Sequence, residues 1–233
     1  MAEAVVRCVG VSRTYQDDSV PVHALSGVDF EVGKGEFVTL AGPSGSGKST
    51  LLNIIGGLDR PTAGSVEVDG VELGSLSESQ LSDLRLRKIG FVFQSYNLIP
   101  VLSAIENVEF IMQLQGVPGA ERAARARGAL EALGIGELEK RRPGELSGGQ
   151  QQRVAVARAI VTEPVLLLAD EPSANLDSAT TRELLDYLRR LNRARGVTIV
   201  AATHDPMVMG YAGRQVGLRD GAIVQDSANV APA

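Results

Sequence analysis

Short apolar runs alternate with polar segments in the first and last thirds of the chain. Such runs predict β-strands over 5–11, 28–32, 37–41, 64–70, 89–93, 165–169 and 198–203. The segment 215–224, with Asp220-Gly221 between its halves, predicts a final hairpin. Polar residues over 76–88 and apolar positions at helical spacing over 181–191 predict two helices.

The middle of the chain has a different pattern. Strand-like runs are missing between about 95 and 162, and the spacing predicts helices over 104–115, 120–133 and 150–161. The run of Arg and Ala at 121–127 is typical of a solvated helix face. The whole pattern predicts an α/β core that is interrupted by a helical insertion.

Composition limits the class of protein. The 233 residues are 44% hydrophobic and 22% charged, with a net charge of −5, so we expect no nucleic-acid partner. The single cysteine, Cys8, excludes an internal disulfide and is expected to be buried in a strand. No apolar run approaches the ~20 residues that cross a bilayer, and the N-terminus does not resemble a signal peptide. We therefore expect a cytosolic chain, unless another subunit holds it at a membrane.

Residues 42–50 form a phosphate loop. Gly42, Gly47, Lys48 and Ser49 match the pattern Gly-x-x-x-x-Gly-Lys-[Ser/Thr], between a predicted strand and a predicted helix start. Glycines at these positions allow backbone N–H groups to approach a phosphate closely. Lys48 is expected to reach the β- and γ-phosphates, and the Ser49 hydroxyl to bind Mg²⁺. The alternative is an ordinary Gly/Ser turn.

Other polar residues follow buried strands, as ligand-binding groups do in α/β folds. Asp170 and Glu171 directly follow the run 165–169. Asp170 is predicted to hold Mg²⁺ through water, and Glu171 is predicted to act as a general base. The alternative is a pair of helix-capping acids. His204 follows the run 198–203 and is predicted to bond the γ-phosphate, although a lone histidine is usually structural. Gln94 ends the run 89–93 and offers an amide to Mg²⁺ and water, or is simply a polar strand end.

Two further features fit a nucleotide site. The signature segment, Leu146-Ser-Gly-Gly-Gln150, places a hydroxyl and two glycine N–H groups at a predicted helix N-terminus, which attracts anions. Its alternative is a plain Ser N-cap. Tyr15 could stack on a nucleobase or belong to the core. His23 is expected to be an ordinary loop or strand residue.

With these motifs the chain resembles the nucleotide-binding subunit of an ATP-binding cassette (ABC) transporter, from about residue 5 to 226. The resemblance implies a P-loop core with a mixed sheet, an N-terminal antiparallel β part and an inserted helical subdomain. Its expected divisions are 1–94 and 163–226 for the core, 95–162 for the insertion and 227–233 for a flexible tail. It also includes the family's D-loop, at Asn175-Leu176-Asp177.

The resemblance implies that two copies pack head to tail around two ATP–Mg²⁺. It assigns catalytic roles to Glu171, His204 and Gln94. It assigns the binding of Mg²⁺ to Ser49, Gln94 and Asp170. The residues expected to contact ATP are Tyr15, Gly42, Ser44, Gly45, Ser46, Gly47, Lys48, Ser49, Thr50, Gln94, Ser147, Gly148, Gly149, Gln150, Asp177 and His204. Of these, Ser147, Gly148 and Gly149 would contact the γ-phosphate bound to the other copy.

Finer motifs resemble the lipoprotein-releasing and macrolide-export group. These are 53–59, 91–97, 106–108 and 170–177, and the one departure is Ser173-Ala174 where that group often has Thr-Gly. The group implies a separate membrane permease, a place on the cytoplasmic face of the membrane and a permease-contacting groove around 96–106. The direction favoured is export or extraction of a lipoprotein, lipid, peptide or drug.

Other classes explain the motifs less well. A soluble ABC-type ATPase acting on ribosomes or DNA usually has two cassettes or a long coiled-coil insertion. A P-loop kinase or GTPase leaves the signature segment without a role, and Asn-Lys-x-Asp, the guanine motif, is absent. A binding module without turnover would not need Glu171 and His204. The sequence does not name a transported substrate.

Overall fold

The fold is built on a six-stranded mixed sheet. The computed structural model describes residues 4–16, 20–174 and 176–228. In spatial order, the strands are β10 (Ala222–Ala228), β9 (Arg214–Arg219), β3 (Phe37–Ala41), β8 (Thr198–Thr203), β7 (Leu166–Asp170) and β6 (Ile89–Val92). The last five run parallel, and β10 pairs antiparallel with β9. The predicted mixed sheet is therefore confirmed.

The register of this sheet brings the predicted motifs together. Ala41 of β3 pairs with Thr203 of β8, and Asp170 of β7 pairs with Ala202 of β8. The carboxyl ends of three neighbouring parallel strands therefore meet at one edge. The phosphate loop, Glu171 and His204 leave the sheet there, which is where open α/β sheets bind ligands.

A second sheet is antiparallel. Its strands, in the order β2-β1-β4-β5, are β1 (Ala4–Tyr15), β2 (Val22–Gly33), β4 (Ala63–Val68) and β5 (Val71–Glu72). The strands β1 and β2 are longer than their apolar runs predicted, because they pair with each other beyond the buried part. Cys8 lies in β1 and is buried, as predicted, and burial with the nearby Asp29 charge raises its thiol pKa to about 12.

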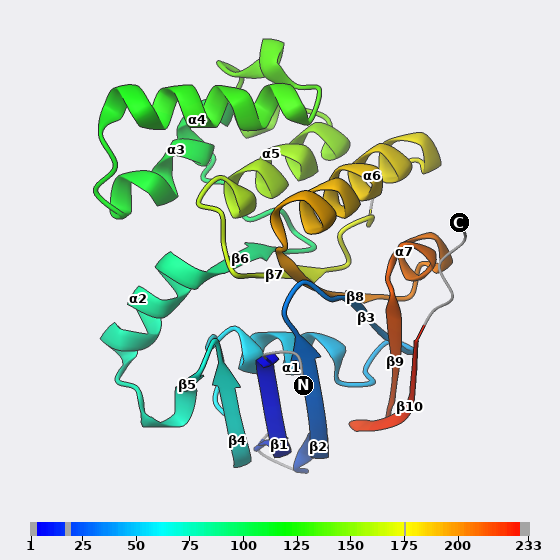
Figure 1. Ribbon diagram of the computed structural model, residues 1–233. Helices are drawn as coiled ribbons and strands as arrows, with labels where there is room; N and C mark the ends of the chain where they lie inside the picture. Colours follow the sequence, from blue (N-terminus) through cyan, green and yellow to red (C-terminus); the bar gives the residue numbers. More distant parts are fainter. Residues whose placement is uncertain (1–3, 17–19, 175, 229–233) are drawn as a thin grey trace.

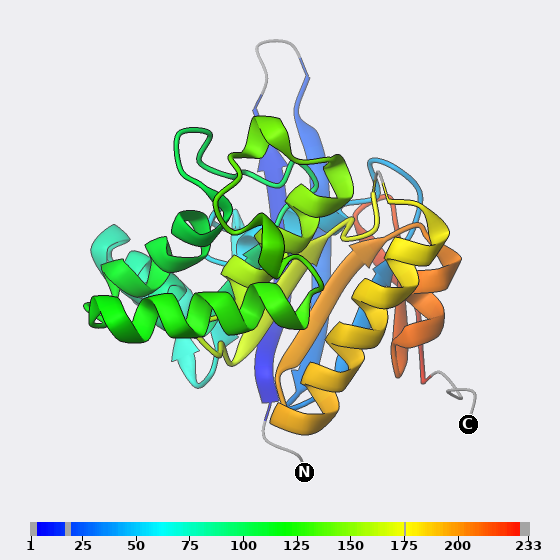
Figure 2. The same cartoon turned by 90° about the horizontal axis from the view of Figure 1, so that it is seen from above.

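Helices cover both faces of the six-stranded sheet (Figure 1). They are α1 (Lys48–Ile55), α2 (Glu78–Lys88), α3 (Ala104–Leu114), α4 (Gly119–Ala132), α5 (Gly148–Ile160), α6 (Ser178–Arg195) and α7 (Pro206–Tyr211). Short 3-10 helices span Leu73–Ser75, Gly136–Leu138 and Pro143–Glu145. The helix α1 lies between the two sheets, whereas α3 to α6 form a layer on the other face (Figure 2).

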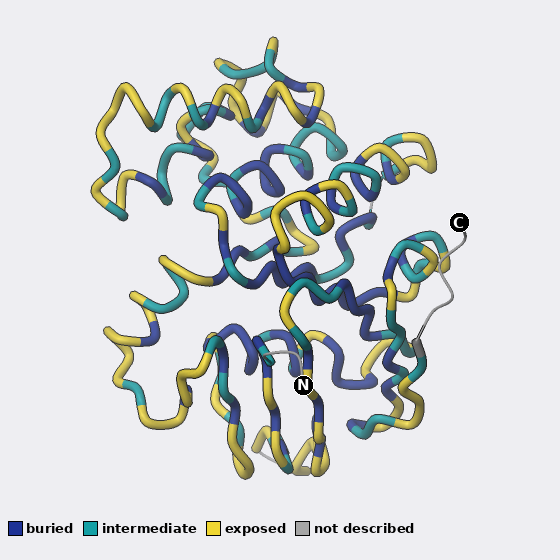
Figure 3. Tube along the Cα trace, in the orientation of Figure 1, coloured by how far each residue is buried: buried dark blue, intermediate teal, exposed yellow. Residues whose placement is uncertain are grey.

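Two buried clusters explain this layering. One joins the face of the six-stranded sheet nearest α1 to the antiparallel sheet and to Leu51, Leu52, Ile54 and Ile55 of α1. The other joins the opposite face to α3, α4, α5 and α6. All six residues of β8 are buried, as expected for a parallel strand that is covered on both faces (Figure 3).

The elements between β6 and β7 are all helical, as the pattern of 95–162 predicted. Their apolar faces share one buried cluster with the sheet and α6, so the insertion packs against the core; its boundaries stay a prediction. The predicted tail at 227–233 starts too early, because Ser227 and Ala228 still pair with Gln215 and Arg214. The residues after 228 lie outside the described part. No helix in the described ranges is both long and apolar enough to cross a membrane.

Candidate nucleotide-binding site

A cleft of about 670 Å³ opens at the edge where β3, β7 and β8 end. We call it the nucleotide cleft. The predicted residues that line it are Tyr15, Ser44, Gly45, Gly47, Lys48, Ser49, Thr50, Gln94, Glu171 and His204. They come from segments that lie up to 189 positions apart in the sequence (204 − 15). The fold therefore gathers most of the predicted site in one place.

The phosphate loop needs glycine for two different reasons. Gly45 and Gly47 have φ angles of 79° and 100°, a region that side chains rarely adopt. Gly42 lies against the backbone carbonyl of Leu218 in β9, so a Cβ atom there would clash. Gly42 and Ser46 do not line the cleft. They attach the loop to the β9–β10 hairpin, since Gly221 N–H donates to the Ser46 carbonyl at 3.2 Å.

Lys48 is the first residue of α1, and its side chain folds back over the loop. Its ammonium donates to the carbonyls of Gly42 at 2.7 Å and Pro43 at 2.9 Å, and the residue is buried. Among the described residues that line the cleft, Lys48 is the one lysine or arginine. The charge is therefore held where the loop would cradle phosphates.

Ser49, which lines the cleft, forms an oxygen pair with Asp170. The Ser49 hydroxyl donates to Asp170 Oδ1 at 3.0 Å, although Asp170 does not itself line the cleft. Burial raises the pKa of the Asp170 carboxyl, while the Ser49 hydrogen bond and the Lys48 charge oppose that shift. A hydroxyl, a carboxylate and the nearby Gln94 amide supply hard oxygen donors, and such a set fits Mg²⁺.

Glu171 has an unusual backbone and a defined partner. Its φ angle is 48°, a conformation that only a few per cent of non-glycine residues adopt. Its backbone N–H donates to the Ala202 carbonyl at 2.9 Å, and Thr203 Oγ1 donates to its carboxylate at 3.3 Å. The other carboxylate oxygen lies 2.7 Å from His204 Nδ1. The histidine side chain is 76% exposed and the glutamate 13%, so this contact joins an exposed imidazole to a largely buried acid.

Four cleft residues were not predicted to contact the nucleotide: Pro43 within the phosphate loop, and Val22, His23 and Ala24 of β2. His23 is a strand residue, as expected, but it also lines the cleft. Its Nδ1 lies 3.0 Å from Thr14 Oγ1. The signal that could have found this wall is the antiparallel pairing of β2 with the end of β1, where Tyr15 lies opposite Val22.

The signature segment does not line this cleft. Ser147 caps α5 in a capping box, with Gln150 N–H 3.3 Å from its hydroxyl and Gln150 Oε1 2.9 Å from its own N–H. The N-cap alternative thus describes what Ser147 does within the chain. Gly149 packs near Leu176 and Thr180, at the start of α6.

Asp177 does not line the cleft either. It caps α6, and hydrogen bonds from the backbone and hydroxyl of Thr180 hold the pKa of the Asp177 carboxyl below its usual value. Asn175 lies outside the described residues. Ser173, at the one departure from the group's motif, keeps a hydroxyl that donates to Asp205 at 2.8 Å. The segment after Glu171 is therefore tied to the residue that follows His204.

Comparisons with known proteins agree with this site. The family model described as ABC transporter matches residues 25–174. The chain is 44% identical to the lipoprotein-releasing system ATP-binding protein LolD of Geobacter metallireducens, over 96% of this chain and 99% of that one. It is also 48% identical to the macrolide export ATP-binding/permease protein MacB 1/2 of Paracoccus denitrificans, over 98% of this chain but 34% of that relative.

A solved structure is similar over nearly the whole chain. It is the dimeric, post-hydrolysis state of the ATP-binding cassette MJ0796 of Methanocaldococcus jannaschii, bound to ADP and Pi. The TM-score is 0.92 at 42% identity, covering 96% of this chain and 98% of that one. Family, relatives and structure agree with the geometry of the cleft, and the chain belongs to the ABC transporter family as an ATP-hydrolysing cassette of the group that includes LolD and MacB.

Proposed function

We propose that two copies of this chain close around two ATP–Mg²⁺ and drive a separate membrane permease. The main evidence for a dimer that encloses the nucleotides is the position of the signature segment. The segment presents a hydroxyl and glycine N–H groups at the N-terminus of α5, an anion-binding arrangement, yet it does not line the chain's own cleft. A second copy, placed head to tail, gives these groups a phosphate to contact. The dimeric structure of MJ0796 supports this arrangement.

The residues of the cleft would divide the work of hydrolysis. Lys48 would neutralise charge on the β- and γ-phosphates, and Glu171 would accept a proton from the attacking water. His204 would orient Glu171 through the 2.7 Å contact and bond the γ-phosphate. Ser49, Asp170 and Gln94 would hold Mg²⁺, which supplies positive charge to the phosphates when bound. Phosphoryl transfer of this kind rests on positioning and charge.

The signature segment can be tested by adding bulk at Gly149. Gly149→Arg is expected to leave ATP binding to a single chain unchanged within about twofold. It should lower ATPase activity of the assembled complex about 100-fold, because phosphate donors from the second copy are lost. Steady-state phosphate release and nucleotide titration measure the two effects.

Two substitutions control for that test. A Cβ at position 149 would lie 3.4 Å from Leu176, an ordinary contact, so Gly149→Ala should retain activity. Gly144→Arg adds the same side chain in open space beside the segment and should also retain it. Full turnover by Gly149→Arg would contradict the shared site.

An apolar cleft offers a surface for the permease. It has a volume of about 670 Å³ and lies between α2, β6, α3 and α5. Its apolar lining includes Leu58, Leu86, Phe91, Phe93, Phe110 and Leu114. Of the groove expected around 96–106, Asn97 and Ile99 contribute, and most of the lining comes from α2, β6 and α3 instead. MacB supports a permease partner, since its name gives one protein both ATP-binding and permease functions.

A charge placed in this apolar cleft should separate transport from hydrolysis. Leu114 lines the cleft and is exposed, so Leu114→Glu is expected to reduce co-purification with the permease at least about tenfold. The basal ATPase activity of the isolated chain should not change. Val224→Glu is the matched control, because Val224 of β10 is also exposed but lies outside both this cleft and the segment 96–106. Equal retention of the permease by both variants would contradict this docking surface.

We further propose a place on the cytoplasmic face of the membrane, through the permease, and a role in export or extraction. Of the expected substrates, a lipoprotein, lipid, peptide or drug, the names of LolD and MacB support a lipoprotein and a macrolide drug. The alternative, a soluble ABC-type ATPase, predicts no membrane partner. Co-expression with a permease from the neighbouring genes, followed by affinity purification from detergent, distinguishes the two.

A further inference from the structure

Tyr15 is held by two residues that the proposed chemistry does not use. Its hydroxyl donates to Asp59 Oδ2 at 2.7 Å. The guanidinium carbon of Arg13 lies 4.5 Å from the centre of the Tyr15 ring, a cation–π distance. Arg13 Nη2 is in turn 2.8 Å from Asp59 Oδ1. The three side chains thus form a closed set of contacts, which we call the Tyr15 clamp.

The clamp leaves one side of the ring available. Tyr15 lines the nucleotide cleft and is 38% exposed. Arg13 and Asp59 are not among the described residues that line the cleft, and their side chains are only 24% and 22% exposed. Tyr15 therefore contributes to the wall of the cleft, whereas the guanidinium that lies over its ring does not.

The position of Arg13 serves its contact with the Tyr15 ring as well as its ion pair with the Asp59 carboxylate. An arginine that served the ion pair alone could present two N–H groups to the carboxylate in a fork. Here Nη2 reaches Asp59, whereas Nε is buried with no hydrogen-bond partner in the part of the chain that the structure describes. Because the guanidinium lies over the ring, it gives up part of the usual fork geometry.

Asp59 connects the clamp to the phosphate loop. It follows α1, the helix that Lys48 and Ser49 begin, and its N–H donates to the Asn53 carbonyl at 3.2 Å. The next residues of this turn are bonded to β1, since Thr62 N–H donates to the Ser12 carbonyl at 2.8 Å. The ring of Tyr15 and the loop that holds phosphate are therefore fixed to the same helix.

We propose that Arg13 and Asp59 are positioning residues that hold the Tyr15 ring ready to stack on the nucleobase. The inference rests on the proposed nucleotide site. An unheld tyrosine at a strand end would have to be ordered on binding, and each immobilised side chain reduces affinity. The clamp orders the Tyr15 side chain when the chain folds, so this loss of side-chain entropy no longer reduces the binding free energy. Its effect must therefore depend on the base and leave the phosphate contacts unchanged.

The test compares a ligand that has a base with one that lacks it. Mg²⁺-ADP and Mg²⁺-pyrophosphate are suitable, because neither carries a γ-phosphate to be hydrolysed. Arg13→Met and Asp59→Asn are each expected to weaken ADP about tenfold and to leave pyrophosphate within twofold. Arg13→Lys keeps the cation and should bind ADP more tightly than Arg13→Met. In a Tyr15→Leu background, Arg13→Met should add less than a twofold effect.

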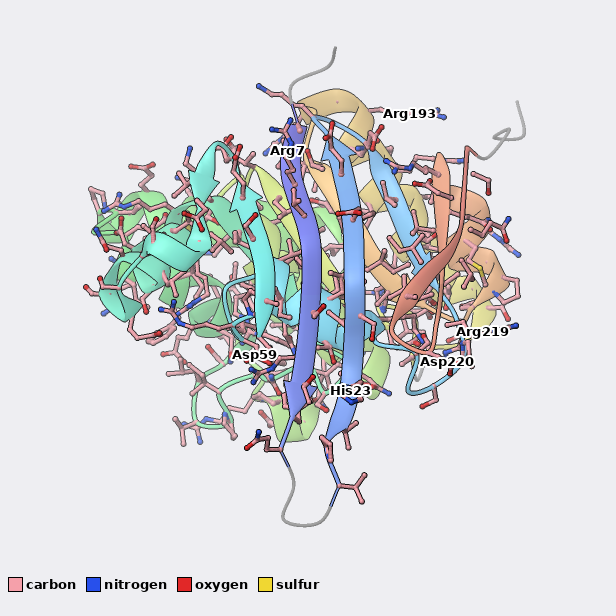
Figure 4. All side chains as sticks on the ribbon, turned by 90° about the horizontal axis from the view of Figure 1, so that it is seen from below. Arg7, His23, Asp59, Arg193, Arg219 and Asp220 are labelled. Carbon is pink, nitrogen blue, oxygen red and sulfur yellow. The ribbon has the colours of Figure 1, made fainter. Side chains whose placement is uncertain are left out.

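Arg7→Met is the matched control. Arg7 lies in the same strand and is also paired with a carboxylate, Glu31, at 3.3 Å. It lies at the far end of β1 from Asp59 (Figure 4), so this variant should bind both ligands normally. Equal weakening of ADP and pyrophosphate by Arg13→Met would show a general defect and overturn the clamp, as would unchanged ADP binding. If the unaltered chain fails to bind ADP, the nucleotide site itself is wrong.

Discussion

Glu171→Gln is expected to slow ATP hydrolysis by about 100-fold or more while ATP still binds. A glutamine has the same shape, but its amide cannot accept the proton of the attacking water, and loss of a general base costs about 10²–10⁴-fold. The carboxamide can still receive the hydrogen bond from Thr203 and remain next to His204. The site should therefore keep its geometry and lose the chemical step.

The same variant should accumulate as an ATP-bound dimer, because the phosphate contacts that close the sandwich persist. Phosphate release measures the rate, and size-exclusion chromatography with and without ATP measures assembly. Glu163→Gln is a close control: Glu163 also has a positive φ, 54°, and is also ion-paired, with Arg195 at 2.6 Å, but it does not line the nucleotide cleft. A Glu171→Gln variant that turns over normally and stays monomeric with ATP would refute the role.

The centre of the site could be predicted because it depends on strand ends. The apolar runs before Gly42, Asp170 and His204 are short and bounded by polar residues, so each motif could be placed at the end of a strand. In a parallel sheet such ends share one edge, and the pairing of Ala41 with Thr203 confirms this for the phosphate loop and His204. Local pattern and sheet topology were sufficient here.

The walls and supports of the site could not be predicted from local pattern alone, because they depend on strand register and on contacts between segments far apart in the sequence. His23 reaches the cleft through the register of β1 with β2, and Asp59 reaches Tyr15 across 44 positions. The left-handed backbone of Glu171 has no sequence signal, because glutamate is not a residue that favours it. The helix α7 did have a signal, Asp205-Pro206, which is typical of a helix start.

Lys48→Ala is expected to abolish tight nucleotide binding, with a loss of at least about 100-fold in affinity. Among the described residues of the cleft, Lys48 is the one lysine or arginine, so its removal leaves the phosphates without their nearest fixed cation. Ammonium–phosphate hydrogen bonds in a partly desolvated site are stronger than neutral ones. Titration with ATP–Mg²⁺ measures the affinity.

The loop itself must be followed in the same variant. Without the ammonium, the carbonyls of Gly42 and Pro43 lose hydrogen bonds of 2.7 and 2.9 Å, although Pro43 is exposed and its carbonyl keeps the bond from Ser46 N–H at 3.3 Å. A typical hydrogen bond contributes about 0.5–1.5 kcal/mol to stability. Thermal unfolding should therefore show a modest loss of stability in Lys48→Ala. Lys34→Ala removes an exposed lysine from the turn between β2 and β3 and should change neither quantity. A folded Lys48→Ala variant with unchanged affinity would count against the assignment of 42–50 as the phosphate loop, because no other lysine or arginine lines the described cleft to replace the charge.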